Sequence, residues 1–217
     1  GRVRLAFVST VGFERLPTWV RDFHAQSPSV SLELVEATGD VQLDAFARSE
    51  IDAGLMLHSP GHAPVGLARL AVSQEPLVLA VPAKHPLARI ARVPLTQVLD
   101  QPLVMFPRRI LPSLHDAVLA LYRSQGAAPR IVQEAIQMQT IVNLVWGGLG
   151  LAWVPASVMQ FRRQGVVYRQ AEAFEPVGRR RIALPACETS LVWLEGEAGD
   201  VPPALRRFID FVRAQLP

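Results

Sequence analysis

Apolar runs of strand length alternate along this chain with longer segments in which apolar residues recur at helical spacing. The strand-like segments, which are short apolar runs or apolar–polar alternations, are 3–8, 30–36, 51–57, 77–81, 103–106, 131–134, 151–154 and 191–194. The helix-like segments, each with an apolar stripe, are 13–23, 39–49, 113–125, 138–146 and 203–215. Strands that alternate with helices in this way imply parallel pairing through right-handed crossovers. The pattern predicts an α/β protein.

The alternation of strand-like and helix-like segments occurs twice, once in the first quarter of the chain and again in its middle part. A length of 217 residues permits either one sheet or two lobes. In the helix expected over 39–49, the spacing predicts that Leu43, Phe46 and Ala47 face inward.

Composition excludes several classes of protein. Half of the residues are apolar and the formal net charge is +3, whereas a disordered chain has low hydrophobicity and high net charge. Cys187 is the one cysteine, so neither a disulfide scaffold nor a cysteine-ligated structural zinc site is expected. No apolar run approaches the roughly 18 residues of a membrane span, and the first residues lack a signal-peptide core. We therefore expect a cytoplasmic protein. Because the chain opens on Gly1 directly in a strand, we also expect it to be a piece of a longer one.

The basic residues do not form a nucleic-acid-binding stripe. Lys84 is the single lysine among 22 basic residues, and the arginine doublets and triplet are spread along the chain. A domain that binds nucleic acid by itself is expected to cluster such residues on one face. Solvated surface is the simpler interpretation.

Signatures of catalysis and metal binding are missing. The sequence has no phosphate-binding P-loop, Gly-x-Ser-x-Gly elbow or His-Glu-x-x-His motif. Residues 147–150, Gly-Gly-Leu-Gly, follow a helix and precede a strand, which is the reverse of the dinucleotide fingerprint and indicates a helix C-cap with a tight turn. Cys187 has no neighbouring histidine. His58 and His62 flank Ser-Pro-Gly, which favours an exposed turn over a metal site. We expect no enzyme activity, metal or cofactor.

The ends of the predicted strands suit a small anionic ligand. In open α/β sheets ligands bind at the carboxyl ends of parallel strands, where helix N-termini offer N–H groups. Hydroxyl-bearing residues or an arginine stand at these positions, together with His58; the candidates are Ser9, Thr10, Thr38, Gly39, Leu57, His58, Phe106, Pro107 and Arg108. Hydroxyls, backbone N–H groups and one guanidinium suit a small carboxylate. Ser9, Thr10 and Thr38 are equally explained as helix N-caps, and the two roles are compatible.

The ordered set of motifs resembles the effector-binding domain of LysR-type transcriptional regulators over essentially the whole chain. The segments that carry the resemblance are Phe7-Val8-Ser9-Thr10, Ile51-Asp52-Ala53-Gly54-Leu55, His85-Pro86-Leu87 and the string from Leu144 to Pro155 with its three glycines. Phe106-Pro107-Arg108 and Gln133-Glu134-Ala135 are similar to the branch that regulates catabolism of aromatic acids.

The resemblance implies a type-2 periplasmic-binding-protein fold of two Rossmann-like lobes joined by two crossover segments. Lobe one would comprise 1–73 and 177–217, and lobe two 74–176. A winged helix-turn-helix DNA-binding domain would precede this chain and is absent from it. The effector would sit between the lobes, and family members form homodimers or homotetramers.

By resemblance, the strand-end candidates become effector-binding residues, and Val154 joins them. Some relatives that bind dicarboxylates carry an arginine where this chain has Leu57, which argues against such an effector unless Arg108 or His58 supplies the charge. The main alternative is a solute receptor that feeds a transporter, because it uses the same fold. An enzyme on this scaffold is a third alternative, which the missing acid–base pair opposes.

Overall fold

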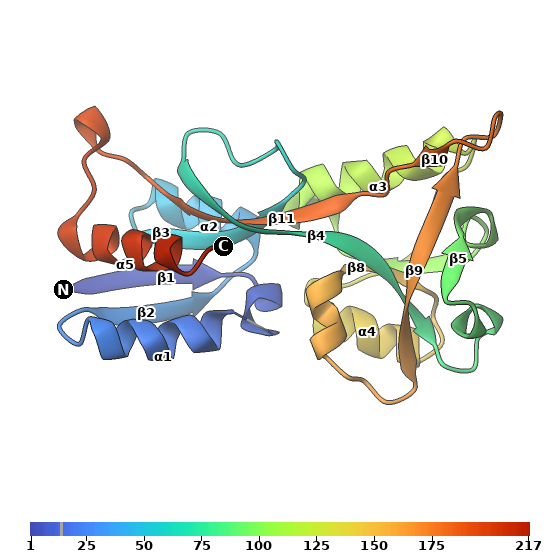
Figure 1. Ribbon diagram of the computed structural model, residues 1–217, viewed down its shortest axis with the longest axis horizontal. Helices are drawn as coiled ribbons and strands as arrows, with labels where there is room; N and C mark the ends of the chain where they lie inside the picture. Colours follow the sequence, from blue (N-terminus) through green and yellow to red (C-terminus); the bar gives the residue numbers. More distant parts are fainter. Residues whose placement is uncertain (14) are drawn as a thin grey trace. The chain divides into compact units, whose positions relative to one another are not determined.

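The computed structural model describes residues 1–13 and 15–217, and they divide into two compact units. Unit 1 comprises Gly1–Gln74 and Glu188–Pro217, and unit 2 comprises Glu75–Cys187. Two long strands belong partly to each unit, β4 (Ala68–Pro82) on the way into unit 2 and β11 (Ala186–Trp193) on the way back (Figure 1). The α/β class predicted from the sequence is confirmed.

Unit 1 is a mostly parallel sheet. Its remaining elements are β1 (Arg2–Phe7), α1 (Leu16–Gln26), β2 (Ser31–Glu36), α2 (Gly39–Ala47), β3 (Ala53–His58) and α5 (Pro203–Ala214). The strand order is β2-β1-β3-β11. Strand β1 runs parallel to β2 on one side and to β3 on the other, whereas β11 is antiparallel to β3. Three adjacent strands therefore end at the same edge of the sheet.

Helices cover both faces of this sheet, because side chains alternate along its strands. Val3 and Leu5 of β1 pack in one cluster with Phe23 of α1 and Phe208 of α5. Ala6 of β1 belongs to a second cluster with residues of α2. The apolar stripes predicted for α1 and α5 are confirmed by these contacts.

The inward face of α2 differs from the prediction. Phe46 is buried as expected, but Leu43 is 43% exposed and Ala47 is exposed. Gln42 and Ala45 occupy the inward positions instead. Apolar spacing alone predicted the wrong side of the helix. The polar Gln42 can be fully buried because its amide donates to the carbonyls of Ala37, just after β2, and of Leu55 in β3.

Unit 2 contains strands of two sheets, together with helices α3 and α4. Its elements are β5 (Arg92–Pro94), β6 (Pro102–Met105), α3 (Pro112–Ser124), β7 (Arg130–Glu134), α4 (Met138–Trp146), β8 (Ala152–Pro155), β9 (Val166–Phe174) and β10 (Arg181–Ile182). Strand β4 pairs antiparallel with β8 and β9, and β9 pairs with β5 and β10. Strands β6 and β7 are parallel, and a parallel bridge from Leu103 to Leu151 connects β6 to the start of β8.

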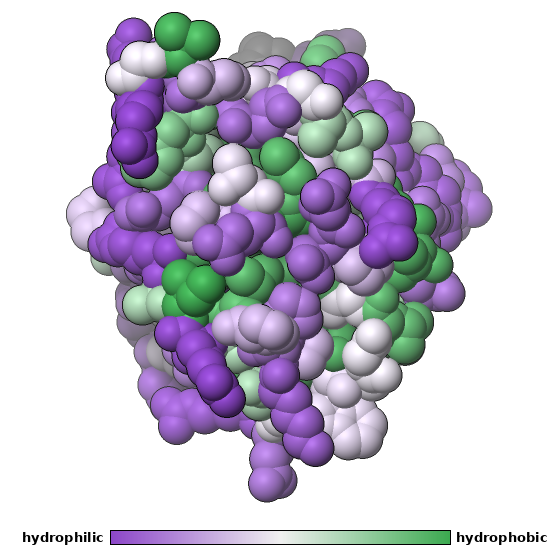
Figure 2. Space-filling model, turned by 90° about the vertical axis from the view of Figure 1, so that its right-hand side faces the viewer, coloured by the Kyte–Doolittle hydropathy of each residue, from purple (hydrophilic) through white to green (hydrophobic). Residues whose placement is uncertain are grey.

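A buried hydrogen bond fixes α3 on β8 in unit 2. Trp153 Nε1 donates to the hydroxyl of Tyr122 over 3.2 Å. Burial raises the pKa of Tyr122 to about 12, since the charged phenolate is unfavourable away from water. The surface at the β5, β9 and β10 end of the unit is largely hydrophilic, with small separate apolar areas (Figure 2).

The chain returns from unit 2 later than the sequence suggested. Residues 177–187, which the prediction assigned to the first lobe, belong to unit 2. The reason is local pairing: β10 is hydrogen-bonded to β9, and the N–H of Leu77 donates to the carbonyl of Pro185 over 3.3 Å.

Candidate functional site

The carboxyl edge of unit 1 brings three candidate segments together. In the ladders Phe7 of β1 lies opposite Glu36 of β2 and Leu55 of β3. Beyond the ladders, the N–H of Ala37 donates to the carbonyl of Phe7 over 2.9 Å, and the N–H of Val8 to that of Leu55 over 3.2 Å. The segments that follow β1, β2 and β3 therefore leave the sheet side by side, as parallel pairing predicted.

Ser9 and Thr10 begin a short 3₁₀ helix, Ser9–Phe13, directly after β1. Ser9 is half-buried, whereas Thr10 is only 4% exposed. Ser9 is therefore the more accessible hydroxyl of the pair. Helix α1 begins at Leu16, after this 3₁₀ turn, and not at Phe13 as its apolar spacing suggested.

Thr38 stands at the N-cap of α2, as predicted, but its side chain makes no capping bond to the helix N–H groups. Its hydroxyl donates to the carboxylate of Asp40 in the first turn. Gly39, the first residue of the helix, is buried. The start of α2 thus offers helix N–H groups, whereas the hydroxyl of Thr38 can donate to a ligand only by giving up its bond to Asp40, whose negative charge lies close by.

Gln42 holds these segments in place, although the sequence analysis did not select it. Its side-chain Nε2 donates to the carbonyl of Ala37 over 2.9 Å and to that of Leu55 over 3.2 Å. A Cβ added at Gly54 would lie 2.3 Å from Gln42 Oε1, so the glycine makes room for the amide. The sequence did carry a signal for Gln42: it is an amide residue among apolar positions of a helix that directly follows a strand end.

Leu57 and His58 at the end of β3 are buried, and His58 is only 2% exposed. His58 Nδ1 lies 2.8 Å from the carbonyl oxygen of Ser59, to which it donates, and Nε2 lies 2.8 Å from Ser190 Oγ. Ser190 Oγ is 3.4 Å from Glu188 Oε1, which also receives Arg69 Nη1 at 2.7 Å. The prediction that His58 belongs to an exposed turn is wrong, because the residue connects β3 to β11.

The corresponding edge of unit 2 contains the other candidates. Phe106 and Pro107 follow β6 and are buried, and the N–H of Ala135, after β7, donates to the carbonyl of Met105 over 3.0 Å. Val154 is fully buried in β8, opposite Val78. The segments 106–108 and 135–137 are therefore neighbours at the ends of two parallel strands.

Arg108 is exposed, and its guanidinium already binds a carboxylate. Nε and Nη2 each donate to Asp116 over 2.8 Å. This hydrogen-bonded pair lowers the pKa of Asp116 and raises that of Arg108. An effector that used Arg108 would have to compete with Asp116, eight positions along the chain.

His115 is a buried polar side chain next to this segment that the sequence analysis did not select. It is 7% exposed, and its Nδ1 has no hydrogen-bond partner. Its ring lies edge-on to Phe106 with 6.0 Å between the centroids. Burial lowers the pKa of His115, with a further lowering from Arg108, against the opposite effects of Asp116 and Glu134.

Within residues 1–13 and 15–217, no group of three or more His, Cys, Asp and Glu residues is arranged to hold a metal ion. The same part of the chain contains no helix with the length and apolarity needed to span a membrane.

An α/β fold in two units, with small polar residues at the ends of parallel strands, is typical of ligand-binding domains. Residues 1–217 match the family described as LysR substrate binding domain. The chain therefore belongs to the LysR family and is a LysR-type effector-binding domain, as its motifs predicted.

Relatives and solved structures agree with this assignment. The regulator IlvR of Caulobacter vibrioides is 40% identical over 96% of this chain, and AlsR of Bacillus subtilis is 29% identical over 81%. The chain spans 67% and 57% of the length of these two relatives. Both are described as transcriptional regulators, not as enzymes.

The fold matches that of solved effector-binding domains. The domain of QuiR in complex with shikimate gives a TM-score of 0.80 at 19% identity, with 99% of this chain and 96% of the other covered. The BenM domain with its effector benzoate gives 0.75 at 22% identity, with 99% and 91% covered. The two-lobe periplasmic-binding-protein-like fold predicted from the sequence is confirmed.

Proposed function

We propose that this domain senses a small organic carboxylate for a LysR-type transcriptional regulator. The observation that carries the proposal is the carboxyl edge of unit 1, where Ser9, Thr38 and the N-terminus of α2 follow adjacent parallel strands. Such an edge offers hydroxyls and helix N–H groups, which favour an anion. Benzoate and shikimate, named with the BenM and QuiR domains, are both ring carboxylates.

In this proposal the candidate residues have different roles. Ser9, Thr38 and Gly39 bind the carboxylate, and the segments of unit 2 at Phe106, Pro107 and Arg108 contact the rest of the effector. Thr10, Leu57, His58 and Val154 shape the surroundings from their buried positions.

We further propose that the effector acts by binding one arrangement of the subunits more tightly than another, since ligand control requires such differential affinity. In the whole regulator a winged helix-turn-helix domain upstream of Gly1 would bind DNA, and the chains would assemble as homodimers or homotetramers in the cytoplasm. Support comes from the greater length of the named relatives and from the structure of full-length CbnR with its target DNA, to which this chain is similar.

A thermal-shift screen of aromatic and aliphatic carboxylates tests the binding site. A carboxylate at about 100 times its Kd should stabilise the domain by about 2.7 kcal/mol. Thr38→Val and Ser9→Ala should reduce this stabilisation, because each removes a hydroxyl at the site. Asp40→Asn should increase it, because the variant removes a negative charge beside the bound anion.

Thr96→Val is the matched control, because Thr96 is an exposed threonine of unit 2 outside the strand ends. If no carboxylate of a broad panel raises the midpoint, the proposed effector class is wrong. If Thr38→Val responds like Thr96→Val, the assignment to this edge is wrong.

A further inference from the structure

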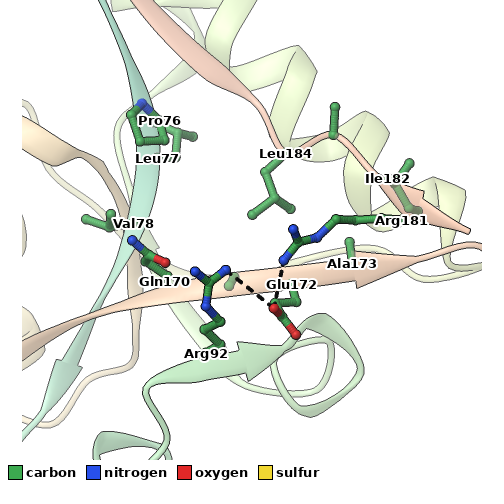
Figure 3. A pocket seen from close by; sticks show the side chains of 12 residues that line it. Pro76, Leu77, Val78, Arg92, Gln170, Glu172, Ala173, Arg181, Ile182 and Leu184 are labelled. Carbon is green, nitrogen blue, oxygen red and sulfur yellow. Dashed lines mark hydrogen bonds and ion pairs between the residues drawn. The ribbon is translucent and has the colours of Figure 1, made fainter.

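A cavity lies in unit 2, away from the strand-end residues of the proposed site. Its volume is about 360 Å³, within the range of about 300–1,000 Å³ that is usual for small-ligand sites. The cavity is bounded by β4, β5, β9, β10 and the segment that precedes β11 (Figure 3). None of the strand-end candidates lines it.

One side of the cavity is apolar. Leu77 and Val78 of β4 and Leu184, after β10, contribute this wall, and Ile182 of β10 lies beside Arg181 (Figure 3). Aliphatic side chains on facing segments suit the hydrocarbon or ring part of a small molecule.

The opposite side carries more positive than negative charge. Arg92 and Arg181 both point at the same carboxylate oxygen, Glu172 Oε1, at 3.5 and 2.7 Å (Figure 3). The two arginine side chains are 59% and 60% exposed, whereas Glu172 is 23% exposed. Two guanidiniums against one carboxylate leave a net charge of +1, and a guanidinium has five N–H donors. Among the described residues, the side chains of Arg92 and Arg181 contact no acidic group besides Glu172.

We propose that this cavity is a second binding site, which takes a small organic monocarboxylate with an apolar body. The carboxylate binds between Arg92 and Arg181, where fork-shaped donors match its two oxygens. The apolar part lies on Leu77, Val78 and Leu184. This site is separate from the effector site proposed above and does not depend on it.

The position of the cavity gives such a ligand access to both connecting strands. Leu77 belongs to β4, by which the chain enters unit 2, and Leu184 lies just before β11, by which the chain leaves it. The N–H of Leu77 donates to the carbonyl of Pro185 between these segments. A ligand that packs on both segments therefore stabilises one conformation of the two connections.

Methyl NMR with 3-phenylpropanoate as the probe tests this site on the domain with labelled Ile, Leu and Val residues. Saturable shifts are expected for the methyl groups of Leu77, Val78, Ile182 and Leu184. Arg181→Leu should raise the Kd by about tenfold or more, since a charge-assisted hydrogen bond is lost. Arg180→Leu is the matched control with the same charge change, and its Kd should equal that of the wild type.

Two further variants separate charge from packing. Glu172→Gln should lower the Kd several-fold, because the internal carboxylate no longer competes for the arginines. Leu184→Trp should abolish the shifts by filling the cavity, with every charge retained.

Three outcomes would overturn the proposal. One is the absence of shifts at these methyl groups up to the solubility limit of the probe. Another is an equal loss of affinity in Arg180→Leu and Arg181→Leu. The third is that Thr38→Val removes the shifts, because they would then report the strand-end site. Persistence of the shifts in Thr38→Val supports an independent cavity, even if the proposed effector function fails.

Discussion

Single side chains fix the local geometry at the candidate edge of each unit, where the parallel strands end. The amide of Gln42 reaches from α2 to the carbonyls of Ala37 and Leu55, so one residue links the segments after β2 and β3. In unit 2, Asp116 holds the guanidinium of Arg108 in a bidentate pair. Gln42 and Asp116 therefore position the residues that are expected to contact a ligand, without needing to contact it themselves.

We expect His115 to make the stability of the domain depend on pH. Burial holds its folded pKa below the ordinary value of 6.5, so the unfolded chain binds a proton more readily. Its contribution to stability is full above about pH 6.5 and is lost as the pH falls from there through the folded pKa. His115→Phe, with an apolar ring next to Phe106, should remove this part of the pH dependence, as measured by urea unfolding between pH 7.5 and 5.

Replacement of the exposed His24 by Asn controls for the loss of one titratable group. An unfolding free energy that falls equally with pH in the wild type and in His115→Phe would show that His115 does not cause the dependence.

The positions of the candidate residues at strand ends were predictable, but their environments were not. Ser9, Thr38 and Phe106 follow strands because apolar runs end there, and the sequence shows this directly. That His58 turns inward to Ser190 depends on a contact between residues 132 positions apart. Such pairings arise from tertiary packing, which periodicity does not encode.

At the scale of elements, the turn between α4 and β8 is packed against β6. The interpretation of residues 147–150 as a helix C-cap and tight turn is confirmed: Gly147 is the C-cap of α4, and Gly148 has a φ of 85°. Gly150 has a different role. A Cβ added there would lie 2.3 Å from the carbonyl oxygen of Pro102, in the backbone that pairs with Leu151.

Gly150→Ala should therefore destabilise the domain by about 1–3 kcal/mol, the usual cost of forcing atoms into a well-packed region. Urea unfolding provides the measurement. Gly12→Ala is the control, because a Cβ added at Gly12 would meet no atom within 4 Å apart from its own chain neighbours and helical turn. It should change the stability by less than about 0.5 kcal/mol. Equal effects of the two substitutions would contradict the close approach of this turn to β6.

The predicted strands include continuous apolar runs and the polar-rich segments 30–36 and 131–134, whereas two other strand segments with many polar residues were missed. Strand β4 begins at Ala68, nine residues before the predicted start, and its first part alternates between exposed and partly buried residues. Strand β9 contains Arg169, Gln170 and Glu172 and was missed altogether. Half-exposed antiparallel strands follow weak polar–apolar alternation, which is easily read as a loop.

At the scale of the whole molecule, the two ends of the chain complete one unit. Phe23 of α1 packs edge-on against Phe208 and Phe211 of α5, with 5.1 and 5.3 Å between centroids. The core of unit 1 therefore depends on residues that are nearly two hundred positions apart, whereas unit 2 is built from the continuous stretch between them.

Phe208→Ala should destabilise unit 1 by about 3–5 kcal/mol, since the side chain is fully buried. Hydrogen exchange followed by mass spectrometry should detect lost protection in 1–74 and 188–217, with protection retained in 75–187. Leu114→Ala, at a fully buried position of α3 in unit 2, should give the reverse pattern. Uniform loss of protection in both variants would show that the units do not unfold separately.

The discontinuity of unit 1 has a consequence for biosynthesis. Domains commonly fold during translation in the order in which they leave the ribosome. Here the inserted unit is complete once Cys187 has emerged, while β1, β2 and β3 still lack β11 and α5. During synthesis β1, β2 and β3 are therefore exposed to aggregation until α5 has emerged to complete the core of unit 1.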